Sequence, residues 1–121
     1  MSAITSTANL TIVQGNLKRA FATTRGFDFV SSTPVMASGV ASIGTSHEAL
    51  PMGDVSTSGW ARLENLDATN YVEIGVVVTG TFYPTIKLKA TEFCVVRLGT
   101  NAPYARANTA AVQLDYVILQ D

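Results

Sequence analysis

Charge is scarce in this chain, and its scarcity excludes two classes of partner. Of 121 residues only 14% are charged, and the formal net charge is −1, whereas ordinary soluble domains carry roughly 25% charged residues. A near-neutral chain lacks the broad positive field with which proteins bind nucleic acid or an anionic membrane surface without sequence specificity. We therefore expect no nucleic-acid partner and no membrane partner.

Cysteine and histidine occur once each, which limits catalytic and metal chemistry. Cys94 stands in the apolar run Phe93-Cys94-Val95-Val96, where a small buried hydrophobe is the simplest interpretation. A lone cysteine forms no intramolecular disulfide, which fits folding in a reducing cytosol. His47 is followed by Glu48, but neighbours in an extended chain point apart, so a surface histidine is expected. We expect no catalytic residue, metal or cofactor, and no enzymatic activity.

Long apolar runs are also missing. The first seven residues lack the basic start and apolar core of a signal peptide. No apolar stretch approaches the roughly 20 residues that a membrane-spanning helix needs. We expect neither a secretory signal nor a transmembrane helix.

What the chain does contain is a series of short β-favouring segments separated by turn residues, with no sustained apolar spacing of three and four residues. Such a pattern predicts an all-β protein, a single-domain antiparallel β-sandwich or barrel over residues 1–121. Residues 1–9, rich in Ser, Thr and Ala, are expected to form a free arm. The strands are expected at residues 8–14, 17–24, 27–30, 35–43, 59–65, 71–78, 82–89, 92–98, 104–107 and 111–119.

Particular residues sharpen this prediction. Gly15-Asn16 is a turn dipeptide and predicts a hairpin. Gly39 interrupts a strand and predicts a bulge or a close backbone approach. Residues 44–58 are expected to be a long connection, with one helical turn or a short strand at 47–50. In residues 111–119 one face is apolar throughout, and the other becomes apolar toward the end, which indicates burial on both faces by a second sheet or a neighbouring subunit.

One turn carries enough oxygen atoms to invite a metal interpretation. Glu64, Asp67, Thr69 and Asn70 surround it, and Ca²⁺ prefers six to eight oxygen ligands. Their spacing matches no metal loop, and Asx residues commonly close turns through side-chain to backbone hydrogen bonds. We therefore interpret Asp67 and Asn70 as hairpin formers.

Aromatic and basic residues are the other candidates for a binding role. Trp60 fits equally a core tryptophan and a partly polar boundary beside Arg62. The tyrosines offer rings on which a sugar can stack, although aromatics spread over strands are usually packing residues. Lys87, Lys89 and Arg97 are expected on facing strands across the turn at residues 90–91, where ion pairs are expected rather than a nucleic-acid groove.

The block from Gly59 to Ala107 resembles the central part of small virion proteins of tailed bacteriophages. In those proteins a glycine-aromatic pair and an asparagine-leucine-aspartate turn precede an asparagine-tyrosine-valine strand, a phenylalanine-proline step and a leucine-lysine-glutamate turn. The matching segments here are Gly59-Trp60-Ala61, residues 65–75, Phe82-Tyr83-Pro84, residues 88–92 and residues 104–107. The glycine that usually precedes the turn glutamate is replaced by Thr91.

The resemblance implies a jelly-roll-like subunit on the virion exterior, made in the cytoplasm of the host bacterium. It implies a head decoration or cement protein, often a homotrimer, that binds across major capsid protein subunits. The alternative is a carbohydrate- or receptor-binding module of a head fibre or tail tip, which would bind a glycan. The residues expected at an interface are Trp60, Arg62, Tyr71, Phe82, Tyr83, Arg97 and Ile118.

Overall fold

The chain consists of two compact units. The computed structural model describes residues 4–27 and 35–121, and the division falls between Met1–Ser32 and Thr33–Asp121. This division differs from the one domain expected over residues 1–121. The two units differ in burial. No described side chain before residue 35 is buried, so the first unit has no core of its own.

The first unit is a β-hairpin, which we call the arm. Strands β1 (Ile4–Gln14) and β2 (Leu17–Phe27) pair antiparallel along their whole length. Gly15 takes the first turn position with φ of +56°, a conformation that glycine adopts without steric cost. The predicted hairpin is confirmed, and residues 4–9 belong to β1 instead of a free arm. The strand expected at 27–30 lies outside the described residues beyond Phe27.

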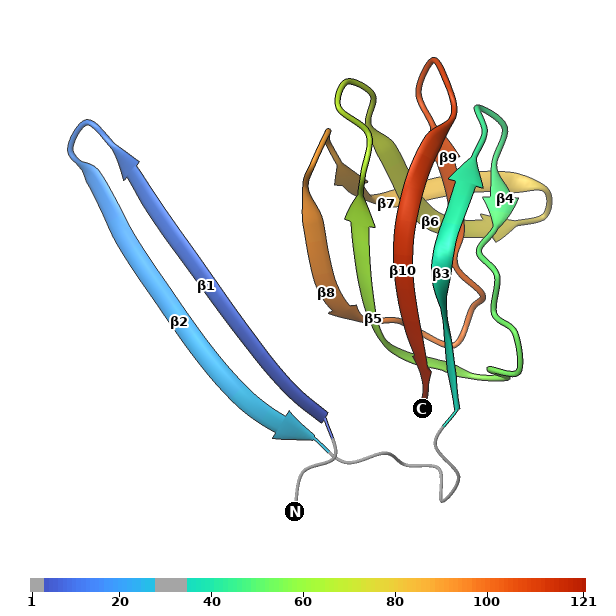
Figure 1. The fold of residues 1–121 in the computed structure, drawn as a ribbon, viewed down its shortest axis with the longest axis horizontal. Coiled ribbons are helices and arrows are strands. Elements are labelled where there is room, and N and C mark those ends of the chain that lie inside the picture. The colour runs from blue at the N-terminus through green and yellow to red at the C-terminus, as the bar shows by residue number, and fades with distance from the viewer. Residues whose placement is uncertain (1–3, 28–34) are drawn as a thin grey trace. The chain divides into compact units, whose positions relative to one another are not determined.

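The second unit is an antiparallel β-sandwich, which we call the sandwich. Its two sheets face each other in Figure 1. The described residues of the chain form strands and no helix. The first sheet contains, in spatial order, β3 (Met36–Ile43), β10 (Val112–Gln120), β5 (Ser58–Asn65) and β8 (Phe93–Arg97). The second sheet contains, in spatial order, β4 (Glu48–Ala49), β9 (Tyr104–Ala107), β6 (Val72–Val78) and β7 (Thr81–Leu88).

The strand pairs of the sandwich are nested along the chain. Strand β3 pairs with β10, β4 with β9, β5 with β8, and β6 with β7. The chain is therefore folded like one long hairpin that is wrapped into two sheets, and successive strands alternate between the sheets until β6 and β7 close the inner hairpin. Strand β4 is the short strand that was one of the two alternatives for residues 47–50.

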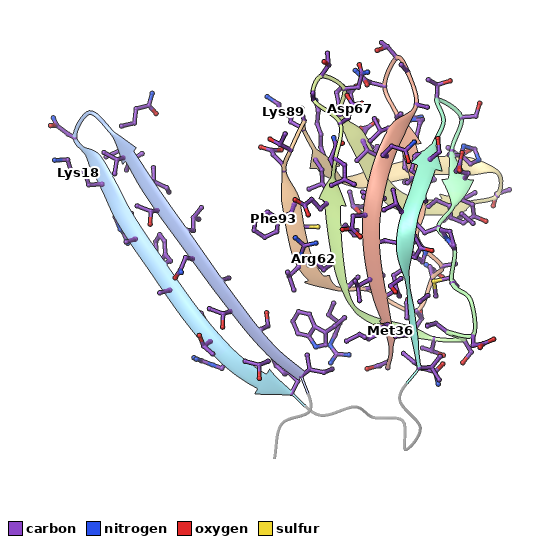
Figure 2. All side chains as sticks on the ribbon, in the orientation of Figure 1. Lys18, Met36, Arg62, Asp67, Lys89 and Phe93 are labelled. Carbon is purple, nitrogen blue, oxygen red and sulfur yellow. The ribbon has the colours of Figure 1, made fainter. Side chains whose placement is uncertain are left out.

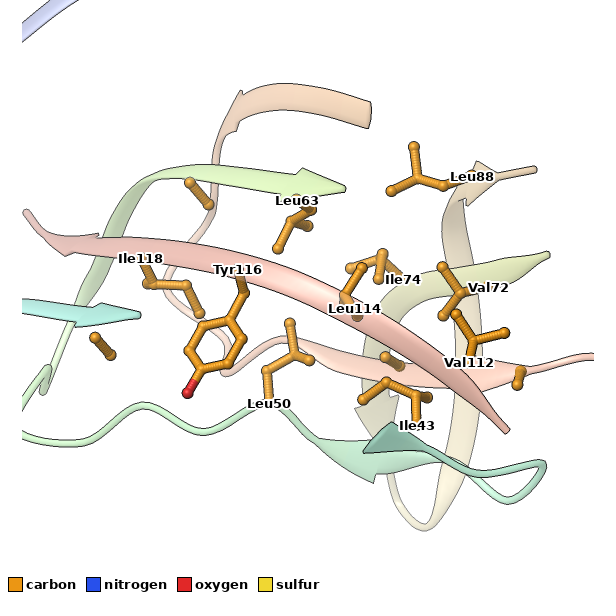
Figure 3. Packing of buried hydrophobic residues seen from close by; sticks show 14 of the residues in the cluster. Ile43, Leu50, Leu63, Val72, Ile74, Leu88, Val112, Leu114, Tyr116 and Ile118 are labelled. Carbon is orange, nitrogen blue, oxygen red and sulfur yellow. The ribbon is translucent and has the colours of Figure 1, made fainter. Parts of the chain in front are cut away.

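The core lies between the two sheets and follows the alternation predicted for the last strand. Strand β10 turns Val112, Leu114, Tyr116 and Ile118 inward, and none of the four is more than 8% exposed. These side chains pack against those of the second sheet in Figure 3. Other buried members are Ala37, Ile43, Leu50, Val55, Ala61, Leu63, Val72, Ile74, Leu88, Ala105 and Ala107.

Two glycines fit positions where a side chain has no room. A Cβ at Gly39 would lie 3.2 Å from the Tyr116 hydroxyl oxygen, so the close approach expected there is made by the Tyr116 ring, and the β3–β10 register is unbroken. A Cβ at Gly75 would overlap the carbonyl oxygen of Tyr83. The β6–β7 register shifts at this point, so Gly75 accommodates a β-bulge.

Candidate functional site

The turn after β5 is a structural support. The buried Asn65 side chain donates to the carbonyl oxygens of Asn70 (2.9 Å), Leu88 (3.1 Å) and Lys89 (3.2 Å). Its own Oδ1 accepts from the backbone N–H of Asp67 at 2.8 Å. Asn65 therefore ties the end of β5 in the first sheet to the end of β7 in the second. Sequence reasoning did not single it out, although an asparagine at an inward strand position was the available signal.

Asp67 closes this turn through the backbone. Its Oδ2 accepts from the N–H groups of Asn70 and Thr69, and these hydrogen bonds lower the pKa of the Asp67 carboxyl below its usual 3.8. The turn-forming role is confirmed, but the hairpin is not. The turn connects β5 and β6, which belong to different sheets, so it is a crossover. Local turn chemistry is the same in both cases.

The basic cluster expected across residues 90–91 does not form as predicted. Strands β7 and β8 lie in different sheets, so Lys87 and Arg97 are not on paired strands. The Lys87 ammonium lies 4.0 Å from the centre of the Tyr71 ring. The Arg97 guanidinium lies over the Trp60 ring and pairs with Asp121.

The outer face of the first sheet gathers three of the residues expected at an interface. Trp60, Arg62 and Arg97 lie there on β5 and β8, since Trp60 pairs with Arg97 and Arg62 with Val95 in the register. Arg62 pairs with Glu64 at 2.9 Å and also lies over the ring of Phe93. Figure 2 labels Arg62 and Phe93. Trp60 is half-buried under Arg97, which supports the boundary interpretation.

This outer face is strongly apolar for a surface. Phe93 is 62% exposed, Met36 59%, Val40 56% and Val95 45%, and the half-buried Val117 and Leu119 lie between them on the central strand β10. Charged side chains lie among them, since Arg62 and Glu64 on β5 and Asp115 on β10 also face outward, so the face combines exposed apolar groups with charges. Sequence reasoning named neither Phe93 nor Val95 as interface residues, although strand alternation beside Arg97 places them on the same face.

The outer face of the second sheet carries an aromatic and charged cluster. The His47 ring stacks on Phe82 with centroids 5.8 Å apart, and it meets Tyr104 edge-on. The Arg106 guanidinium covers Phe82 at 4.8 Å and pairs with Glu73 at 2.9 Å. Phe82 is thereby only 8% exposed. His47 is a surface histidine, as predicted, and its ring covers an aromatic residue.

The remaining interface candidates are divided by burial. Tyr83 is 53% exposed on β7, and Tyr71 is half-buried beside Lys87. Ile118 has no exposed surface within the sandwich. Its assignment to an interface is wrong, because its position on β10 alternates with the outward residues and places it in the core.

Cys94 and a cleft between the sheets are two further features of the sandwich. Cys94 is half-buried against the core, and burial raises the pKa of its thiol. An open cleft of about 360 Å³ separates the sheets near β7 and β8, with Val76, Ile86, Val96 and Leu98 among its apolar lining. Within residues 4–27 and 35–121, no three His, Cys, Asp or Glu side chains gather into a metal-binding group, and no helix is long and apolar enough to cross a membrane.

The arm is amphipathic in a way that becomes clear once its register is known. One face carries Leu10 opposite Phe21 and Ile12 opposite Arg19, with Ile4, Ala8 and Leu17 in line. The other face is rich in threonine, and the Thr7 and Thr24 hydroxyls share a hydrogen bond of 3.0 Å. Leu10 is 58% exposed, Leu17 53% and Phe21 48%. The arm therefore carries an apolar face that its own two strands leave exposed.

Comparison with protein-family models, with curated proteins and with solved structures gave no match to this chain.

Proposed function

We propose that this protein is a structural virion protein of a tailed bacteriophage. It decorates the head and stabilises it by binding across major capsid protein subunits, and it acts by burying surface and not by catalysis. The observation that carries the assembly role is the exposed apolar surface on both units, on the arm and on the outer face of the first sheet. Extended apolar surfaces on a small protein mark interaction sites.

The assignment to a phage head draws on two further supports. The segments from Gly59 to Ala107 resemble small virion proteins of tailed phages. The nested strand pairs, in the order β3-β10-β5-β8 and β4-β9-β6-β7, support a jelly-roll, an architecture of two four-stranded sheets used by many capsid domains. We propose that the assembled protein is a homo-oligomer, with a trimer favoured.

Reconstitution on capsids that lack the protein tests this function. Purified protein is incubated with such capsids and the particles are imaged. Ordered density at junctions between major capsid subunits is the expected result. Density at the tail, or no density on particles that are otherwise intact, would contradict head decoration.

A second candidate is a carbohydrate- or receptor-binding module on a head fibre or tail tip. The His47, Phe82 and Tyr104 cluster favours it, because aromatic rings beside the Arg106–Glu73 pair combine a stacking surface with hydrogen-bonding groups. Glycan-array binding that is lost in Tyr104→Ala, a change within this cluster, would support this function over decoration. An array with no signal at micromolar protein would reject it.

A further inference from the structure

We infer that the arm is an exchange element: the arm of one copy packs its apolar face on the outer face of the first sheet of the next copy. This inference rests on the assembly part of the proposed function and names the surfaces that build the oligomer. The first reason is that an isolated two-stranded hairpin is at best marginally stable in water. The arm, with exposed Leu10, Leu17 and Phe21, needs a surface to cover its apolar face.

Net charge indicates which partner covers the apolar face of the arm. Residues 4–27 contain Lys18, Arg19 and Arg25 and no acidic residue and carry +3, and the whole first unit carries +2 because it also includes Asp28. Residues 35–121 contain five Lys or Arg against eight Asp or Glu, so the sandwich carries −3. Arms repel one another and sandwiches repel one another, whereas an arm and a sandwich attract. A copy of this same chain supplies the matching surface.

The charges also sit on the two apolar faces. Arg19 and Arg25 lie on the face of the arm that carries Leu10 and Phe21, and the Arg19 guanidinium is 5.2 Å from the Phe21 ring centre. On the first sheet, Asp115 lies directly opposite Glu64 in the register, with Val40 beside Asp115 and Phe93 beside Glu64. Arg62 already pairs with Glu64 at 2.9 Å, so Asp115 is the carboxylate of this face that an arginine from an incoming arm would meet.

Size indicates exchange between copies in a closed assembly. A two-stranded ribbon of 11-residue strands is about 10 Å wide and about 35 Å long, a footprint of about 350 Å². A standard stable interface buries about 800 Å² on each partner. One docked arm falls short, but a copy that both gives and receives an arm reaches about 700 Å². Reciprocal or cyclic exchange therefore suits a closed symmetric oligomer.

Sedimentation equilibrium of the unaltered chain and five variants tests the exchange. Leu10→Ser with Phe21→Ser removes two apolar anchors of the arm, and Phe93→Ser removes one from the sheet without touching the arm. We expect the double variant to weaken association by about 100-fold or more, and Phe93→Ser by about 10-fold or more. Val13→Ser is the matched control, because Val13 is 69% exposed on the opposite face of the arm. It is expected to associate like the unaltered chain.

Two charge-changing variants test whether the arm docks on this sheet without removing any apolar side chain. Arg19→Glu is expected to weaken association, and adding Asp115→Arg to it is expected to restore at least part of the loss. An unaltered chain that is monomeric, or arm and sheet variants that keep the mass of the unaltered chain, would overturn the exchange. Capsid binding is measured separately: variants of unchanged mass that still bind capsids refute only the exchange, and an arm-dependent oligomer that leaves capsids bare refutes only the decoration role.

Discussion

At the scale of single residues, some backbone positions that favour glycine are occupied by glycine and others are not. Gly15 and Gly75 are glycine where the chain needs glycine, at a turn with φ of +56° and at a bulge. Thr91, in the turn between β7 and β8, has φ of +67°, a region that a β-branched residue rarely adopts.

Gly75→Ala is expected to destabilise the sandwich by about 3 kcal/mol, the upper part of the range for overpacked sites. The added methyl group would overlap the Tyr83 carbonyl oxygen, which is backbone and cannot swing aside. Gly99→Ala is the control, since nothing lies within 4 Å of a Cβ there. Urea denaturation of both variants measures the difference, and equal midpoints would show that the bulge tolerates a side chain.

Thr91→Gly is expected to raise the free energy of unfolding by about 0.5–1 kcal/mol. Removing the Cβ relieves the left-handed strain of about 1–2 kcal/mol, and the greater freedom of glycine in the unfolded chain returns part of it. Thr100→Gly, at an exposed loop position without positive φ, is expected to lose stability instead. Chemical denaturation compares the two, and a loss in both would contradict strain at residue 91.

Asp67 makes the stability of the β5–β6 crossover depend on pH. Its folded pKa lies below the usual 3.8 because two backbone N–H groups bind its carboxylate. The stabilisation is thus complete above 3.8 and is lost as the pH falls through the lower folded value. We expect Asp67→Asn to be less stable than the unaltered chain at pH 7, with a difference that shrinks below pH 3.8. A difference that stays constant to pH 2, or one matched by Asp54→Asn, would refute this role.

At the scale of elements, the strands could be predicted and their partners could not. Period-two alternation and turn residues located nearly every strand of the sandwich to within about two residues, because both are local signals. Whether a turn closes a hairpin or crosses between sheets depends on distant strands. The turn at Asp67 and the one at Thr91 were predicted to join paired strands for this reason, and both cross between sheets.

Some residues of the candidate site could be predicted from the sequence and others could not. Alternation placed Trp60, Arg62 and Arg97 on one outward face, where the structure has them. Ile118 lies on the apolar face of the last strand, for which burial by a second sheet or by a neighbouring subunit was left open, and the second sheet covers it. The apolar face of the arm needed the register of β1 with β2, since only pairing brings Leu10 opposite Phe21.

The arm is an element whose removal is expected to leave the sandwich intact. Every member of the buried core lies within residues 37–118, so deletion of residues 1–32 removes no core side chain. The truncated chain is expected to keep its unfolding free energy within about 1 kcal/mol, measured by urea denaturation at a concentration where the full chain is monomeric. Loss of cooperative unfolding would show that the arm belongs to the folding unit.

At the scale of the whole molecule, the proposal of assembly rests on apolar surface that the chain leaves exposed. The sandwich buries one apolar face of each sheet, yet Phe93, Met36, Val40 and Val95 remain on the outside of the first sheet. The arm adds a second exposed apolar face and the opposite net charge. The proposed exchange between copies would remove both of these apolar surfaces from water, which is the source of its free energy.

The mass of the 121-residue chain in solution is the most direct test of assembly through these surfaces. Sedimentation equilibrium at micromolar concentration and physiological salt measures it without a capsid or a ligand. We predict a closed oligomer whose mass is a whole multiple of 12.8 kDa, three times that value if the trimer is right. A single species of 12.8 kDa across the micromolar range would contradict assembly through these surfaces.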